Sequence, residues 1–175
     1  MTNKEQIAKW AAEAALEFVE KRQEKEKKSR YDRRLRNTRL LLRNYGLLKN
    51  HCEKSVYNLQ QIPVDNAIDI LDAIDKMDGT AYIESIKKSV TKTYIIINHV
   101  DRMLELYEVY CQKSKQEEDR RRYRVLIASY FDSVEVSEIM RRENIEERTY
   151  YRDMRDAIDI LSALIFGIDS LQDMS

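Results

Sequence analysis

The sequence predicts an all-α protein in which an N-terminal domain of long, coiled-coil-like helices precedes a C-terminal domain of three helices. Only three Gly and one Pro occur in 175 residues, too few for the many turns of a β-sandwich or barrel. Charged residues make up 35% of the chain. Hydrophobic residues recur at intervals of three and four over long stretches, the period of a helix that buries one face. A chain of this length can hold one large domain or two small ones.

The first predicted helix covers about residues 4–28. One face carries apolar side chains, with a tryptophan beside them: Ile7, Trp10, Ala11, Ala14, Ala15 and Phe18. Residues 21–28 have no apolar position at all. A helix that is polar on every side either bridges solvent or is unstable. We therefore expect this N-terminal arm to be ordered only where a partner holds it.

Two longer helices are predicted next, over residues 31–61 and 80–112. Each carries a seam, a row of mainly apolar side chains at alternating intervals of three and four, such as Ile97, Val100 and Leu104. Ile62-Pro63 should end the first of these helices, since Pro disfavours helical geometry in the residue before it. A short helix with Val64, Ala67 and Leu71 inward should follow and close at Asp78-Gly79. The two seams can pack on each other or across a dimer axis, so we expect a homodimer.

The charged stretch 113–119 interrupts the pattern and divides the chain into domains 1–115 and 116–175. Three helices are predicted in the second domain: residues 119–131, a short helix capped by Asp132-Ser133, and a longer helix from about Glu147. Between the last two, Asn144 can adopt the left-handed conformation and Ile145 can wedge the helices apart. A short helix, a turn of about four residues and a longer helix form the helix-turn-helix pattern.

The last helix predicts a DNA-reading surface near its N-terminal end. Its free side carries polar and charged side chains: Glu147, Arg148, Thr149, Tyr151, Arg152 and Arg155. A recognition helix meets base edges and phosphates in the major groove with this part of its length. Arginine can pair with guanine, Thr and Tyr can donate to phosphate, and Glu can accept from cytosine. The alternative is a plain three-helix core with a solvated charged face.

A family resemblance supports the DNA-binding interpretation. The stretch 134–161, with Ser137-Glu138-Ile139-Met140, Asn144-Ile145 and Arg148-Thr149-Tyr150-Tyr151-Arg152, is similar to the region-4 helix-turn-helix of sigma factors. With residues 37–45 and 163–167, the wider chain resembles phage-encoded late-gene transcriptional regulators of the ArpU/RinA type. The resemblance implies sequence-specific binding of double-stranded DNA at promoters and activation of late phage genes, such as those for packaging or lysis. Glu146 departs from the pattern, because these motifs usually place Ser or Thr there, so an acidic side chain is expected to cap the helix.

The charge of the chain is unevenly distributed, although its formal net charge is zero. Residues 21–54 contain 13 Lys and Arg against 4 Asp and Glu. Neutralising phosphates with such a block would add salt-sensitive affinity that does not depend on sequence. The candidate phosphate contacts are arginines of this block and of residues 120–124: Arg33, Arg34, Arg36, Arg39, Arg43, Arg121 and Arg122. A solvated helix face is an equally good interpretation of the block.

Catalytic, metal and cofactor sites are not predicted. His51, Cys52, His99 and Cys111 lack the paired spacing of a zinc site. The acidic residues of the two amphipathic helices are expected on solvent-facing stripes: Asp65, Asp69, Asp72 and Asp75 in one, and Asp153, Asp156 and Asp159 in the other. The chain has no Gly-rich phosphate loop and no signature of a nucleophile with its base. We therefore expect a protein that is not an enzyme.

The expected location is the cytoplasm. No apolar run approaches the length of a membrane span, the first residues lack a signal-peptide core, and two isolated cysteines fit a reducing compartment. Two other functions remain open. One is a helical adaptor that binds RNA polymerase or a sigma factor without touching DNA. The other is a small terminase-like packaging subunit, which combines a helix-turn-helix with oligomerising helices.

Overall fold

The computed structural model describes residues 3–53 and 67–167, with side chains from Gln6 onward, and every regular element in these ranges is a helix. The predicted all-α class is confirmed for this part of the chain. None of its helices is both long and apolar enough to cross a bilayer. The elements are α1 (Asn3–Arg43), α2 (Tyr45–Glu53), α3 (Ala67–Ile74), α4 (Gly79–Lys87), α5 (Val90–Lys113), α6 (Glu117–Tyr130), α7 (Val136–Glu143) and α8 (Glu147–Phe166).

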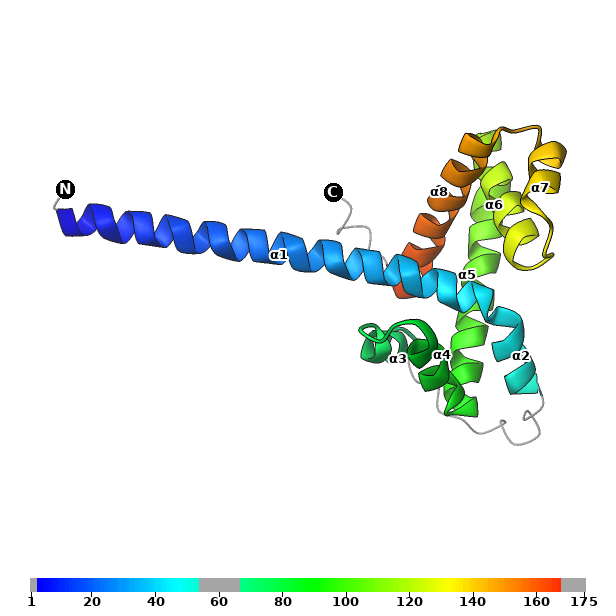
Figure 1. Cartoon of the computed structure of the whole chain (residues 1–175), viewed down its shortest axis with the longest axis horizontal. Helices are drawn as coiled ribbons and strands as arrows, with labels where there is room; N and C mark the ends of the chain where they lie inside the picture. The colour runs from blue at the N-terminus through cyan, green and yellow to red at the C-terminus, as the bar shows by residue number, and fades with distance from the viewer. Residues whose placement is uncertain (1–2, 54–66, 168–175) are drawn as a thin grey trace.

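The molecule consists of a helical body and a long projecting helix (Figure 1). The N-terminal half of α1 extends away from the body, whereas its C-terminal half crosses it. The helices α6, α7 and α8 lie on one side of α1, and α3 and α4 lie on the other. Helix α5 contacts α2, α3, α4, α6 and α8, so it holds the two sides together.

The main hydrophobic core joins the two ends of the chain. Leu41 and Leu42 of α1 are buried against side chains of α5 and α8 that include Val100, Leu161 and Phe166. The seam predicted over residues 83–111 is likewise buried within the chain, because Ile97, Val100, Leu104, Tyr107 and Cys111 all belong to this core. Its side chains are therefore not available to a second subunit.

The N-terminal helices differ from the prediction, since residues 3–43 form one unbroken helix rather than two. The polar stretch stays helical because it contains no Gly or Pro and because pairs four residues apart support it. Lys21 lies 2.6 Å from Glu17, and Arg22 lies 3.1 Å from Glu26. The helix ends at Arg43, and at Asn44 both the backbone amide and the side-chain amide donate to the Leu40 carbonyl, at 3.1 Å and 2.9 Å.

The prediction of one helix over residues 80–112 is wrong, because α4 and α5 are separate. Ser89 has an extended backbone, and its hydroxyl accepts a 3.3 Å hydrogen bond from the Lys92 amide, so it caps α5. Gly79 has a φ of 51° and is the first residue of α4, whereas the helix that it was predicted to close ends at Ile74. The last part of the helix predicted over residues 31–61 and the predicted positions of Ile62, Pro63, Val64 and Asp65 lie outside the described residues.

The turn between α7 and α8 has the predicted conformation, since Asn144 is left-handed with φ 51° and ψ 51°. A small second core, with Val125, Ile139 and Tyr150 fully or almost fully buried and Ile145 against it, fixes α7 against α6. The predicted cap of α7 is wrong, because Glu135 rather than Asp132-Ser133 precedes the helix. Glu146 occupies the cap position of α8, as predicted, but its side chain forms no hydrogen bond to the helix.

Candidate nucleic-acid interface

The N-terminal part of α8 presents the predicted reading residues on its outer face. Arg148, Tyr151, Arg152 and Arg155 are exposed, as is Glu147, while Thr149 is half-buried. Within the described ranges, Arg152 and Arg155 form ion pairs with the carboxylates that follow them in sequence, at 3.7 Å from Asp153 and 3.4 Å from Asp156, and Arg155 also interacts electrostatically with Asp159. Arg148 forms no ion pair with any residue in the described ranges. These side chains can therefore reach an external ligand without breaking a strong contact.

Tyr150 fixes the N-terminal part of α8 to the rest of the fold. Its ring is buried in the second core, and its hydroxyl shares a 3.0 Å hydrogen bond with the Ser129 hydroxyl of α6. The ring also makes an edge-to-face contact with Tyr151, with a centroid distance of 5.2 Å. Since a buried tyrosine with a partnered hydroxyl holds one orientation, it fixes the start of α8 against α6.

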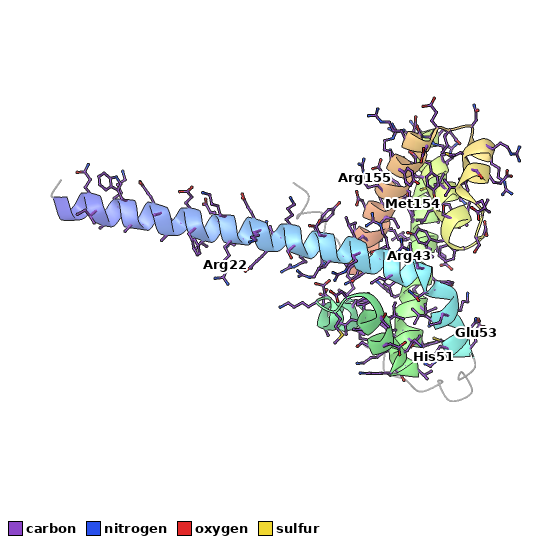
Figure 2. All side chains as sticks on the ribbon, in the orientation of Figure 1. Arg22, Arg43, His51, Glu53, Met154 and Arg155 are labelled. Carbon is purple, nitrogen blue, oxygen red and sulfur yellow. The ribbon has the colours of Figure 1, made fainter. Side chains whose placement is uncertain are left out.

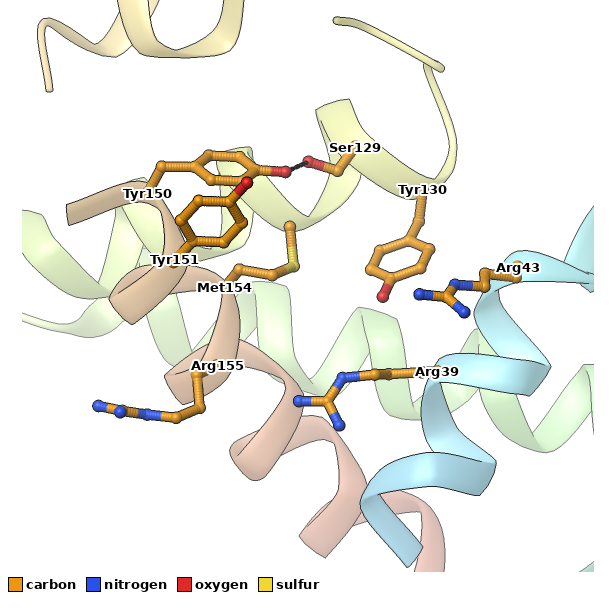
Figure 3. A pocket seen from close by; sticks show the side chains of 8 residues that line it. All are labelled: Arg39, Arg43, Ser129, Tyr130, Tyr150, Tyr151, Met154 and Arg155. Carbon is orange, nitrogen blue, oxygen red and sulfur yellow. Dashed lines mark hydrogen bonds between the residues drawn. The ribbon is translucent and has the colours of Figure 1, made fainter. Parts of the chain in front are cut away.

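A groove of about 380 Å³ opens between the C-terminal part of α1 and the N-terminal part of α8 (Figure 3). Arg39 extends from α1 into the space between the two helices, and Arg43 lies beside Tyr130. Side chains of three helices line the groove: Arg39 and Arg43 from α1, Ser129 and Tyr130 from α6, and Tyr150, Tyr151, Met154 and Arg155 from α8. The fold thus joins two predicted sets of binding residues that lie more than 100 residues apart in sequence.

The electrostatics of the groove suit an anion. Neither Arg39 nor Arg43 forms an ion pair with a residue that the structure describes, although Arg39 interacts electrostatically with the half-buried Asp159 and Arg43 hydrogen-bonds to the Tyr130 hydroxyl. Two guanidinium groups thus face the groove without a carboxylate in direct contact. Burial raises the pKa of Tyr130, although Arg43 and Arg39 oppose that shift. The Tyr130 hydroxyl therefore keeps its proton at neutral pH and can donate a hydrogen bond beside the two arginines.

The other arginines predicted to contact phosphate are engaged inside the fold. Arg33 lies 2.8 Å from Asp75, and Arg36 donates to the Met77 carbonyl at 3.2 Å, so both contact the segment that follows α3. Arg34 is only 6% exposed and lies over the Phe166 ring. Arg121 and Arg122 are half-buried in ion pairs, with Asp153 at 2.6 Å and with Asp119 at 3.0 Å.

Three aspartates predicted on solvent-facing stripes lie elsewhere. Asp153 is 0% exposed between α6 and α8, and Asp75 is buried beside Arg33 and Asn37. Asp159 is half-buried and accepts a 2.9 Å hydrogen bond from the Tyr31 hydroxyl. Asp69 and Asp72 are exposed as predicted, and Asp156 is half-buried. In each corrected case a partner from a distant helix draws the carboxylate inward.

The histidines and cysteines form no metal site in the described ranges, where no three potential ligands gather. His99 bonds to the Ile165 carbonyl at 2.8 Å, and His51 bonds to the Lys87 carbonyl at 3.1 Å. Cys52 and Cys111 are buried free thiols.

Four residues of the groove were not predicted as part of a binding site. Tyr130, Tyr150 and Met154 fall on the inward faces of their helices, so their period indicates core, and Ser129 carries no signal of its own. Each lies at the edge of the core where α1 crosses α8, and only the tertiary contact between these helices exposes it to the groove.

The chain matches no family model, no curated protein and no solved structure.

Proposed function

We propose that this protein is a sequence-specific DNA-binding transcriptional regulator, in which α7 and α8 act as a helix-turn-helix and α8 enters the major groove. One observation carries the proposal: the exposed N-terminal face of α8 continues into a groove lined by Arg39 and Arg43, neither of which forms an ion pair with a described residue. Base-reading side chains flanked by phosphate-neutralising ones are the two components of specific DNA recognition.

The two groups of side chains have different roles in this proposal. Arg148, Thr149 and Arg152 read base edges, because they lie at the free end of α8 where a recognition helix meets the bases. Arg39, Arg43 and Arg155 contact the phosphates that border the groove, and Tyr130 adds a hydroxyl donor. The resemblance of residues 134–161 to sigma region 4 supports a promoter as the target, and the wider resemblance supports activation of late phage genes.

Fluorescence anisotropy with duplexes from the neighbouring phage operon tests the proposal. We expect binding that prefers one duplex over a scrambled one and that weakens steeply as salt rises from about 50 to 200 mM. Arg148→Ala and Arg152→Ala should each weaken binding to the preferred duplex by about 1–3 kcal/mol and relax the preference. Arg39→Ala should weaken binding to both duplexes alike and lower the salt slope by about one unit.

Arg102→Ala is the matched control, because Arg102 is an exposed arginine on α5 outside the groove lining. It should bind both duplexes like the parent chain. Lack of DNA binding even at low salt would contradict the proposal, and retention of RNA polymerase or a sigma factor by the same protein would then favour an adaptor. Specific binding to packaging sites by a ring-shaped oligomer would favour a terminase-like subunit.

A further inference from the structure

The projecting half of α1 exposes more apolar surface than a solitary helix normally carries. Every side chain from residue 6 to residue 30 is exposed, and the first buried one is Arg34. Figure 2 shows Arg22 on this free length, well away from the body. Five large apolar side chains here are between 48% and 68% exposed: Ile7, Trp10, Leu16, Phe18 and Val19. Exposed apolar surface of this kind marks an interaction site.

Four of the apolar residues form a stripe along one side of the helix. Ile7, Ala11, Ala14 and Phe18 follow one another at intervals of four, three and four, the spacing of a coiled-coil seam. The ion pairs along this part of α1 are exposed and contribute only about 0.2–0.5 kcal/mol each. Most helical stability in proteins comes from tertiary packing of one face, and this length of α1 has no such packing, so a partner along the stripe would stabilise it.

The charges beyond the stripe indicate how a partner helix must run. Continued at the same spacing, the seam meets Lys21, Lys25 and Lys28. A parallel copy would place these three lysines against themselves and would bring two globular bodies together. An antiparallel copy centred between Ala11 and Ala14 sends Lys25 and Lys28 of the two copies to opposite ends, so that only Lys21 of each copy meets a seam lysine, at position 4 of the other copy. In this pairing Asn3, the first residue of α1, lies opposite Arg22, before the body begins at Tyr31.

We infer that a second copy of this chain covers the stripe, with the two α1 helices packed antiparallel. The pairing is self-complementary, as a two-fold interface requires: Ile7 of each copy faces Phe18 of the other, and Ala11 faces Ala14. The small alanines at the centre let the helix backbones approach closely, while the larger side chains at the ends fill the space between them. This pairing does not depend on DNA binding, so it stands or falls separately from the proposed function.

Sedimentation equilibrium of the full chain tests the association. We expect a dimer in the micromolar range, and Phe18→Glu should weaken dimer formation by at least about tenfold, because it places a charge on each half of the seam. Leu16→Glu is the matched control: Leu16 is 64% exposed against 68% for Phe18 but lies off the stripe. It should dimerise like the parent chain. A monomeric parent chain at about 100 µM, or equal effects of both variants, would overturn the inference.

Spin labels on Lys27→Cys test the orientation. With a rise of 1.5 Å per residue, antiparallel helices centred between Ala11 and Ala14 place the two labels about 45 Å apart. Parallel helices would place them within about 20 Å, given interaxial distances of 8–10 Å. The parent chain, whose two thiols are buried, gives the labelling background. A short distance would contradict the antiparallel pairing even if the chain is a dimer.

Discussion

Asp153 carries a charge into the interface between α6 and α8, where Arg121 donates to it at 2.6 Å. Removing one member of a buried ion pair leaves the other without compensation. We predict that Asp153→Ala lowers the free energy of unfolding by about 3–5 kcal/mol, measured by urea denaturation. Asp156→Ala is the control, because its pairs are partly exposed and should contribute about 0–1 kcal/mol. Equal losses in both variants would contradict the structural role given to Asp153.

The two thiols should respond to pH and to reagents as buried groups. Burial raises the pKa of Cys52 and that of Cys111 from 9.0 to about 11. The folded chain therefore favours the protonated thiol, and the unfolded chain ionises first. The resulting stabilisation is complete below pH 9 and is lost as pH rises from about 9 to 11.

We therefore predict a free energy of unfolding that declines above about pH 9. Both thiols should also react much more slowly with Ellman's reagent at pH 8 in the native protein than in guanidinium chloride, since the thiolate is the reactive form. Equal rates in the two states would show that the thiols are accessible.

The period of a helix predicts which side chains share a face, but not which charges lie inside. It correctly places Arg148 and Arg152 opposite the buried Tyr150 and Ala157. Asp153 follows Tyr150 by three residues and precedes Ala157 by four, so the same period also places it inward. Because Asp153 is acidic, it was instead predicted to face solvent. Its partner Arg121 lies 32 residues earlier in the sequence, so no local pattern indicates the buried ion pair.

At the scale of the elements, the turn between α7 and α8 depends on Asn144. A β-branched residue tolerates its left-handed conformation poorly, whereas glycine adopts it freely. We predict that Asn144→Val lowers the free energy of unfolding by about 1–2 kcal/mol and that Asn144→Gly changes it by less than about 0.5 kcal/mol. Thermal unfolding of both variants measures the difference. Equal destabilisation by the two substitutions would mean that the side chain, not the backbone angle, matters here.

The sequence predicts the number of helices near the C-terminus better than it predicts their breaks near the middle. Asn144 is a local signal for a turn, and it is sufficient to predict the break between α7 and α8. By contrast, the apolar spacing passes through Ser89 without interruption, so only the serine capping interaction distinguishes α4 and α5 from one helix. The groove could not be predicted from the sequence. Arg39 and Arg155 line the same groove only because α1 packs on α8.

At the scale of the whole molecule, the projecting arm should be separable from the body. The described contacts of α1 with other helices begin at Tyr31, which bonds to Asp159. We predict that deleting residues 1–28 shifts the thermal unfolding midpoint of the body by no more than a few degrees, because no core contact is removed. The mean helical ellipticity per residue should fall, as circular dichroism can measure. Deleting residues 1–42 removes the buried Leu41 and Leu42 and should prevent folding.

Because α1 is one unbroken helix from Asn3 to Arg43, its length would set the distance between the bodies of two paired copies. If two copies pair through the stripe and each binds DNA through its groove, the two Arg39 side chains lie about 80 Å apart along the paired rods. That span corresponds to roughly 24 base pairs of B-DNA, or a little over two turns. A stiff rod transmits changes in its own length, so adding seven residues within 21–30 should widen the preferred spacing of two target sites by roughly six base pairs.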